Sequence, residues 1–290
     1  MGRSASWRVS AVCVLILAAS SRIAAQDAPS AGAGVVAEKA AVSQTDSAPS
    51  REAPSYYLEL GGFYSGLDNN YGSWKGADAK FGYTGSKRFA PFFTFSSQTR
   101  KEGSQQNFGG YSYLTFSKKV WAIVGAGGAP ERNVVLYPKA RVDGSVYIAV
   151  PKKPGLFLSA GFSDFFMPNG GGGRIHSVGT IYYHGPLIVS GSVGFNYSRP
   201  GNVPSQSGQV GFQYGSQGKH WFGAGLAVGK VAYQLVSLTP FDVRFNTAGV
   251  NAFYQQWIGR HWGVIAHYDY QDEVHAFQRH GLSGSAFFEF

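Results

Sequence analysis

The feature that most constrains the fold of this sequence is a series of strand-length segments separated by joins of two kinds. From Tyr56 onward, short polar joins alternate strictly with longer joins rich in Gly, Asn, Pro or charge. The short joins are Thr84–Lys87, Ser117–Lys119, Pro151–Pro154, Tyr183–Pro186, Ser216–Lys219 and Gly259–His261. The longer joins lie near Leu67–Gly72, Lys101–Gln106, Gly128–Asn133, Pro168–Gly173, Pro200–Gly208, Leu238–Arg244 and Gln271–His280. This asymmetry is typical of antiparallel hairpins that share one rim of short turns and one rim of longer loops.

Within the segments, apolar and polar residues alternate with the period of a β-strand. In residues 189–198, the odd positions hold Val, Gly, Phe or Tyr, and the even positions hold Ser, Gly or Asn. The last ten residues follow the same rule, because Leu282, Phe288 and Phe290 oppose Ser283 and Glu289. A soluble β-sandwich alternates in the same way, so this pattern alone leaves both architectures open.

The composition favours a single large all-β domain that lies in a membrane. Only 14% of the residues are charged, whereas 16% are aromatic and 40 are glycine; soluble domains average about 25% charged residues. Mean hydropathy is −0.13, yet after the first 25 residues no apolar run approaches the ~20 residues of a transmembrane helix. If the chain crosses a membrane, we expect it to do so with strands.

Aromatic residues gather beside the short joins, which favours a membrane barrel over a soluble sandwich. In a closed barrel the short turns share one rim, so aromatic residues near them would form a girdle at one membrane interface. The expected girdle consists of Phe89, Trp121, Phe157, Tyr182, Tyr183, Trp221, Trp257 and Trp262.

The sequence therefore predicts an all-β, antiparallel, up-and-down transmembrane β-barrel over residues 55–290. The joins divide it into about fourteen strands, with twelve as the alternative if one hairpin is misassigned. An even number places both termini on the periplasmic side, where the last strand would pair with the first. We expect Phe288 and Phe290 to face lipid and to serve as the signal for the barrel-assembly machinery.

The N-terminus predicts export to the bacterial cell outer membrane. Arg3 and Arg8 precede a short apolar run that ends in small residues, the pattern of a secretory signal peptide over residues 1–25. Residues 26–54 are rich in Ala, Ser, Pro and Val and predict a disordered periplasmic linker. Cys13 lies in the apolar run, so the mature chain contains no cysteine; this favours a bacterial envelope protein over a disulfide-bonded secreted one.

The basic balance of the chain does not indicate nucleic-acid binding. The formal net charge is +9, but the sequence has no basic helix, zinc motif or RNP-like motif. Outer-membrane lipid is the partner that the pattern predicts.

The C-terminal half contains the motifs Ile181–Gly185, Tyr197–Gly201, Gly211–Gly215, Gln256–Gly259, His261–Gly263 and Arg279–Gly281. In these motifs it resembles the YaiO-type outer-membrane β-barrels of Gram-negative envelopes. The resemblance runs from about Leu156 to Phe290, and the N-terminal strands match in pattern alone. It implies a porin-like fold and an outer-membrane location. None of its motifs is a catalytic signature.

Charged residues on the inward face of the predicted strands are the main candidates for function. Lys139, Arg141 and Asp143 would project inward together, as would Asp78 and Lys80. His267 and Asp269 share a face, and Glu59 and Glu289 would lie on adjacent strands once the barrel closes. The expected lumen-lining residues are thus Glu59, Asp78, Lys80, Lys139, Arg141, Asp143, His267, Asp269 and Glu289.

Catalytic and metal sites are poorly supported by the spacing. His280 and Ser283 are three positions apart, and His176 and Ser177 are adjacent, so in each pair the two side chains diverge on a strand. His275 and His280 do not make a metal-ligand set. We therefore expect no enzymatic activity, no metal and no cofactor.

Two functions from different classes remain open. The first is a narrow pore or export component for small polar solutes or saccharides. The second is a closed structural or surface-interaction barrel without conductance. An outer-membrane hydrolase ranks third.

Overall fold

The computed structural model describes residues 55–290 except 70, 131–135, 169, 232–244 and 274–276. The predicted signal peptide (1–25) and linker (26–54) lie outside the described residues. No helix in the described part of the chain is long and apolar enough to cross a membrane.

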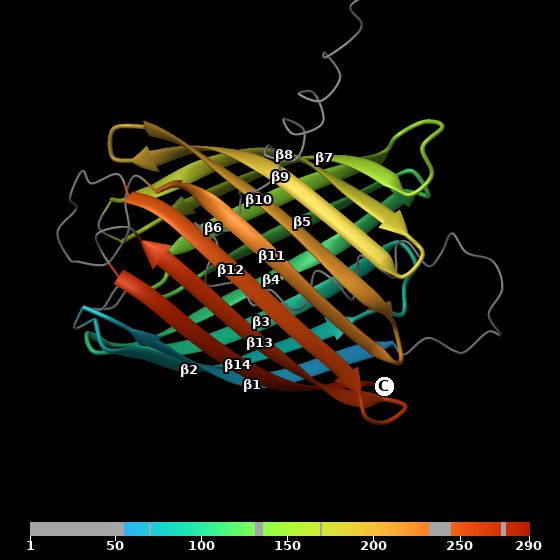
Figure 1. Ribbon diagram of the computed structural model, residues 1–290, viewed down its shortest axis with the longest axis horizontal. Helices are drawn as coiled ribbons and strands as arrows, with labels where there is room; N and C mark the ends of the chain where they lie inside the picture. The colour runs from blue at the N-terminus through green and yellow to red at the C-terminus, as the bar shows by residue number, and fades with distance from the viewer. Residues whose placement is uncertain (1–54, 70, 131–135, 169, 232–244, 274–276) are drawn as a thin grey trace, which may run out of the picture.

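In the described residues, fourteen strands form one closed antiparallel barrel in which each strand pairs with its neighbours in the chain (Figure 1). This confirms the fourteen-strand prediction over the twelve-strand alternative. The strands are β1 (Tyr56–Leu67), β2 (Ser73–Tyr83), β3 (Phe89–Arg100), β4 (Gly103–Ser117), β5 (Val120–Gly128), β6 (Ala140–Ala149), β7 (Leu156–Phe166), β8 (Gly172–His184), β9 (Leu187–Arg199), β10 (Val203–Ser216), β11 (His220–Val231), β12 (Phe245–Trp257), β13 (Trp262–Glu273) and β14 (Phe277–Glu289).

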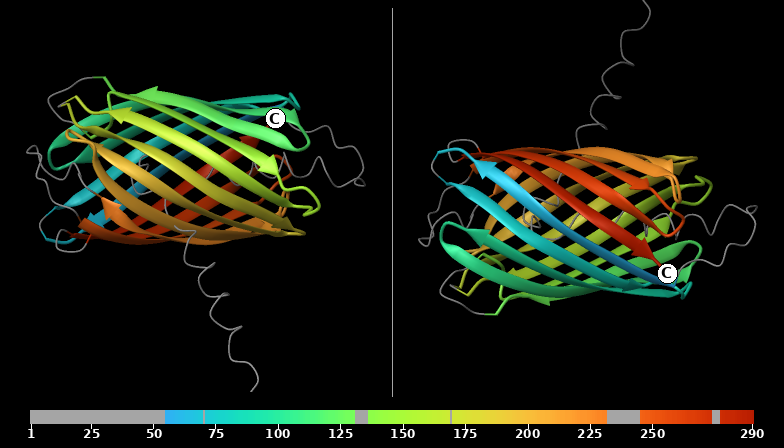
Figure 2. Two further views of the ribbon diagram at one scale, coloured as in Figure 1. Left: turned by 90° about the horizontal axis from the view of Figure 1, so that it is seen from above. Right: turned by 90° about the horizontal axis from the view of Figure 1, so that it is seen from below.

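The barrel closes where β14 pairs with β1, as expected of the last ten residues (Figure 2, right). Tyr57 lies opposite Glu289, and Glu59 lies opposite Phe287. The terminal residue takes part in the closure, because Tyr56 N donates to Phe290 O at 2.7 Å and Phe290 N donates to Tyr56 O at 3.0 Å. The start and the end of the barrel therefore lie at one rim, which we call the terminal rim.

Three of the predicted long joins are mostly strand. β4 begins at Gly103, β10 begins at Val203, and the last hairpin keeps only residues 274–276 outside its strands. Ser, Gln and Gly also suit loops, but here they lie on both faces of the wall, for example inward Gln105 and outward Ser104, while their backbone pairs with the neighbouring strand.

The strict alternation of join lengths is also not kept. The join at 150–155, on the terminal rim, is longer than those at 101–102 and 200–202 on the opposite rim. The two longest intervals between strands, Gly128 to Ala140 and Val231 to Phe245, do lie on the opposite rim. We call this the loop rim, and it corresponds to the outer side of outer-membrane barrels.

The two faces of the wall are inverted relative to a soluble protein. Large apolar residues such as Leu60, Phe93, Leu158, Leu226 and Leu282 are exposed on the outside. The buried polar residues, among them Glu59, Lys80, Gln105 and Glu289, face inward. An apolar surface of this extent is stable only against lipid.

Candidate functional site

The inner face of the wall near the terminal rim carries an apolar belt. Its buried members are Tyr57, Ala90, Phe92, Tyr113, Trp121, Phe157, Ile188, Trp221, Trp257, Ile265 and Phe287. Tyr111, Ile123, Tyr147, Ala149, Ile181, Tyr183 and Phe253 pack against them. Among the described residues, this lumen belt draws on every strand except β2 and β10.

The prediction of an eight-residue aromatic girdle at the membrane interface is wrong for five of its members. Phe89, Tyr182 and Trp262 face outward and are exposed, as a girdle requires. The other five are inside the barrel: Trp121, Phe157, Trp221 and Trp257 are buried, and Tyr183 packs on the belt. Nearness to a turn fixes the height of a residue, whereas its face depends on register, and adjacent residues such as Tyr182 and Tyr183 take opposite faces.

The rings of the belt pack on one another along the wall. Trp121 and Tyr147 stack with ring centroids 3.7 Å apart and an interplanar angle of 3°. Phe92 stacks on Tyr111 with centroids 5.1 Å apart, and Trp257 meets Phe287 edge-on at 5.0 Å.

Glycine on the neighbouring strand lets these rings lie across the wall. A Cβ added to Gly82 would overlap the ring of Phe92, and one added to Gly263 would lie 2.6 Å from Phe287 Cζ. This arrangement of an aromatic ring over a cross-strand glycine is a known device for covering bare backbone.

A buried charge cluster lies next to the belt at the closure between β14, β1 and β2. Lys80 Nζ lies 2.5 Å from Glu59 Oε2. The same carboxylate accepts hydrogen bonds from Tyr57 Oη at 2.6 Å and Ser285 Oγ at 2.9 Å. On the adjacent strand β14, the Glu289 carboxylate accepts a hydrogen bond from Trp257 Nε1 at 3.1 Å. Both inward carboxylates therefore have donors, as buried charges require.

Further ion pairs line the lumen beyond the belt. Arg141 and Asp143 pair at 2.8 Å on β6, and Arg279 on β14 pairs with Asp269 on β13 at 2.9 Å. The side chain of Asp269 is 41% exposed although it faces inward, and inward-facing Asn251 is also exposed. This part of the lumen therefore holds space for water beside charged and amide groups.

In the join between β5 and β6, the described residues Leu136 and Tyr137 are buried against the inner face of the wall. Gln105, buried on the inner face of β4, accepts from Leu136 N at 2.7 Å and Tyr137 N at 2.9 Å, and it donates to Pro130 O at 3.0 Å. The Tyr137 hydroxyl lies 3.0 Å from Ser96 Oγ, which donates to Asp78 at 2.6 Å. The sequence signal for this latch is the Leu136-Tyr137 pair in the join, and sequence reasoning missed it.

The remaining predicted lumen residues are placed as follows. His267 is partly buried on the inner face of β13, and its ring lies 5.8 Å from that of Phe253. Lys139 precedes the first residue of β6, and its side chain is exposed. The other seven predicted residues make the contacts described above. Glu59, Lys80 and Glu289 lie at the closure, Arg141, Asp143 and Asp269 form ion pairs, and Asp78 accepts from Ser96.

The side-chain pairs considered for catalysis do not converge. His280 faces outward, where its Nδ1 lies 2.9 Å from the Tyr268 hydroxyl, whereas Ser283 lies opposite inward-facing His267. His176 and Ser177 also face opposite sides of β8. Asp269 is engaged by Arg279. Within the described ranges, no group of three or more His, Cys, Asp or Glu residues is placed to hold a metal ion.

Comparison with protein families gives one match. A family model described as the YaiO membrane beta barrel domain matches residues 55–234. The match begins at the first strand, so it includes the N-terminal strands that the sequence resemblance left out, and it ends before β12. No protein with a curated description matches the sequence.

Solved structures with a similar fold are outer-membrane barrels. A bacterial polysaccharide outer membrane secretin aligns over 83% of this chain and 100% of its own, at 7% identity and a TM-score of 0.54. The monoaromatic hydrocarbon channel CymD aligns over 94% and 98%, at 10% identity and a TM-score of 0.52. The Ralstonia pickettii toluene transporter TbuX aligns over 82% and 90%, at 10% identity and a TM-score of 0.50. At these identities the likeness shows the fold alone.

Proposed function

Because this chain belongs to the YaiO membrane β-barrel family and is an outer-membrane β-barrel protein, we propose that it is a narrow pore that admits saccharides and other small polar solutes. The observation that carries this proposal is the juxtaposition, inside one lumen, of an aromatic belt and water-exposed ion pairs.

That juxtaposition suits the surface of a sugar. A pyranose ring has an apolar C–H face that packs on aromatic rings and an equator of hydroxyl groups that hydrogen-bond to charged or amide side chains. The lumen belt supplies the first kind of contact through its partly buried rings, such as Tyr111, Tyr147 and Tyr183. Asn251 and the Asp269–Arg279 pair supply the second. Ligand sites generally combine apolar walls with a few placed polar groups.

The strand number is compatible with a restricted passage. About eight strands give an interior filled by side chains, and sixteen or more leave a wide aqueous channel. Fourteen strands fall between. The names of the similar structures, a polysaccharide secretin and two hydrocarbon transporters, agree with transport as the class of function.

A closed barrel is the second candidate, and a specific observation favours it. The buried members of the lumen belt are at most 8% exposed, and the latch through Gln105 and Tyr137 fills part of the lumen toward the loop rim. If both hold in the membrane, the barrel would be a structural or surface-interaction protein without conductance.

Single-channel recording separates the two candidates. The signal-peptide-free chain, refolded and inserted into a planar bilayer, should give small discrete conductance steps, and added oligosaccharide should reduce them reversibly. Conductance steps that oligosaccharide does not change would support a pore and contradict saccharides as its solute. If no conductance steps rise above those of the bare bilayer at any salt concentration, the pore proposal is wrong and the closed barrel is the remaining candidate.

We also propose that the barrel is not an enzyme, since the His-Ser pairs diverge and Asp269 is held by Arg279. Assays of lipid deacylation and peptide cleavage by the refolded protein should match a protein-free control. Turnover above that control would contradict this proposal.

A further inference from the structure

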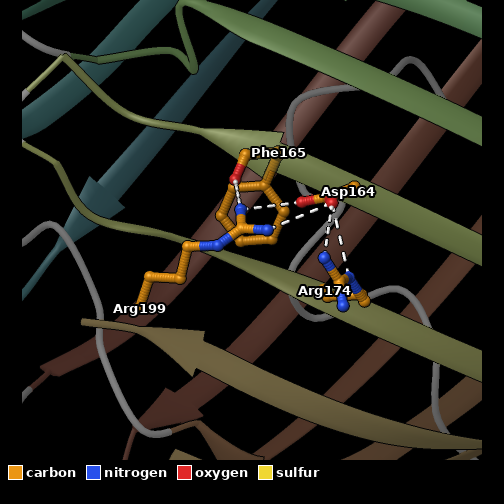
Figure 3. Close-up of polar contacts among 4 residues, drawn as sticks. All are labelled: Asp164, Phe165, Arg174 and Arg199. Atoms are coloured by element: carbon orange, nitrogen blue, oxygen red, sulfur yellow. Dashed lines mark hydrogen bonds and ion pairs between the residues drawn. The ribbon is translucent and has the colours of Figure 1, made fainter. Parts of the chain in front are cut away.

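Three charged residues lie together on the lipid-facing surface, at the ends of three strands near the loop rim (Figure 3). They are Asp164 on β7, Arg174 on β8 and Arg199 on β9. Side chains two positions apart on a strand share a face. Asp164 shares its face with exposed Phe162 and Phe166, and Arg199 shares its face with exposed Phe195 and Tyr197. We call these three residues the outer charge cluster.

The carboxylate holds the two guanidinium groups side by side. Arg199 approaches Asp164 through both terminal nitrogens, at 2.7 and 3.1 Å, and also donates to Phe165 O at 3.2 Å. Its guanidinium lies 4.5 Å from the centre of the Phe166 ring. Arg174 makes two longer contacts to Asp164, both at 3.4 Å. Arg199 is thus fixed by four interactions, and Arg174 is held more loosely.

The height of the cluster corresponds to the lipid headgroups. Arg174 lies ten positions from exposed His184, near the other end of β8. At about 3.3 Å per residue and a tilt of about 40°, this is about 25 Å, the height of the apolar band of outer-membrane barrels. Exposed Phe166 and Tyr197 beside the cluster are the aromatic residues expected at that interface.

The cluster keeps an excess positive charge that points outward. Two arginines and one aspartate leave one net positive charge. The Arg174 side chain is 51% exposed, against 15% for Asp164, and beyond Asp164 the described residues provide no further partner for its N–H groups. A guanidinium has five N–H donors in a planar fork that matches phosphate oxygens.

We propose that Arg174 and Arg199 bind the phosphate group of a lipid headgroup in the outer leaflet of the membrane. The phosphate would sit on the exposed side of the two guanidinium groups, opposite Asp164. The acyl chains or sugar of the same lipid would pack on Phe166 and Tyr197. A lipid is the favoured source of the phosphate because the cluster faces the bilayer rather than the lumen or the loops. The site is independent of whether the barrel conducts.

The test compares lipids that differ only in phosphate. The refolded full barrel in detergent is titrated with a bisphosphorylated lipid A and with its dephosphorylated form, and bound lipid is counted by native mass spectrometry. The wild-type protein should prefer the phosphorylated lipid by about tenfold or more, the range expected of charge-assisted hydrogen bonds.

Three variants assign that preference to the cluster. Arg174→Gln should lose about tenfold in affinity for the phosphorylated lipid alone. Lys75→Gln is the matched control, because Lys75 is an exposed outward cation near the loop rim on distant β2, and it should bind like the wild type. Asp164→Asn keeps the shape of the side chain and one oxygen that accepts from Arg199, and it raises the net charge by one, so it should bind more tightly, a gain that misfolding cannot imitate.

Four results would overturn the proposal: equal binding of the two lipids, wild-type affinity in Arg174→Gln, an equal loss in Lys75→Gln, or no gain in Asp164→Asn. Inorganic phosphate identifies the source. At concentrations near those of the lipid it should not displace the phosphorylated lipid; displacement would assign the cluster to free phosphate and contradict a lipid site.

Discussion

Two tryptophans near the terminal rim lie on opposite faces of the barrel wall, one in the lumen and one toward lipid. Trp121 is 5% exposed and stacks on Tyr147 inside the lumen, whereas Trp262 is 41% exposed and faces lipid. The first ring narrows the lumen, and the second anchors the wall at the interface, where an indole is favoured. Only the first should influence passage through the barrel.

We therefore expect Trp121→Ala to increase single-channel conductance, because it removes a ring from the lumen belt. The same change should destabilise the barrel by about 3 kcal/mol, as loss of a large buried ring does. Trp262→Ala is the matched control and should leave conductance unchanged. Bilayer recordings of both variants, with urea unfolding in detergent, check this; equal conductance in Trp121→Ala and the wild type would show that the ring does not border the passage.

Position 82 needs glycine because the ring of Phe92 lies directly over it. A methyl group there would overlap Cδ1 and Cε1 of buried Phe92, so Gly82→Ala should destabilise the barrel by about 1–3 kcal/mol through overpacking. Gly66→Ala is the control, since nothing lies within 4 Å of an added Cβ. Urea midpoints of the two refolded variants measure the difference, and a midpoint for Gly82→Ala no lower than that of Gly66→Ala would exclude this role.

At the scale of the strand, the period of two residues predicted the existence of the elements, and the count of joins predicted fourteen of them, with twelve as the alternative. Their ends were less predictable, because Gln105 and Ser104 look like loop residues although they sit in β4. The faces of the aromatic residues were hardest, since one residue of uncertainty in a turn exchanges lumen and lipid for a whole strand. The charged lumen residues were easier, because a lipid-facing charge is costly in the middle of the membrane and is tolerated only near the interfaces, where Asp164, Arg174 and Arg199 lie.

The latch of the β5–β6 join was unpredictable for a different reason. Gln105 binds Leu136 and Tyr137, about thirty positions away, and no local pattern specifies that pairing. The outer charge cluster likewise joins three strands through one carboxylate. Such contacts follow from barrel register, which the sequence pattern defined only to within a residue or two.

The latch itself gives a prediction at this scale. Gln105→Ala removes the acceptor of two backbone N–H groups and should expose the Tyr137 amide to exchange about tenfold or more faster, the range for a lost buried hydrogen bond. Ser104→Ala changes the exposed neighbouring residue and should leave that amide protected. Hydrogen exchange read by mass spectrometry over residues 136–139 distinguishes them; unchanged protection in Gln105→Ala would mean that the latch is held by other contacts.

For the whole molecule, closure is the step that removes the last free strand edges. The β1–β14 seam contains both the backbone pairing of Tyr56 with Phe290 and the buried Glu59–Lys80 pair, whose carboxylate also accepts from Ser285 on β14. Burying that pair is tolerable only once β14 is in place to complete its hydrogen bonds. The end of the chain therefore contributes to the polar interior as well as to the apolar exterior.

The last prediction concerns Phe290, which is 60% exposed and stacks on Tyr56 at 5.8 Å. Phe290→Asp should reduce the amount of folded barrel in the outer membrane, because we expect the terminal aromatic residue to be recognised by the barrel-assembly machinery and because it pairs with the first strand. Phe116→Asp is the control: Phe116 is 65% exposed, close to the terminal rim at the end of β4, and carries the same cost of a charge near lipid without the terminal position. Outer-membrane fractions with heat-modifiable gel migration should show a larger loss for Phe290→Asp. An equal loss in both variants would mean that the effect comes from placing a charge near lipid. Normal levels of folded barrel in Phe290→Asp would contradict a role of Phe290 in assembly.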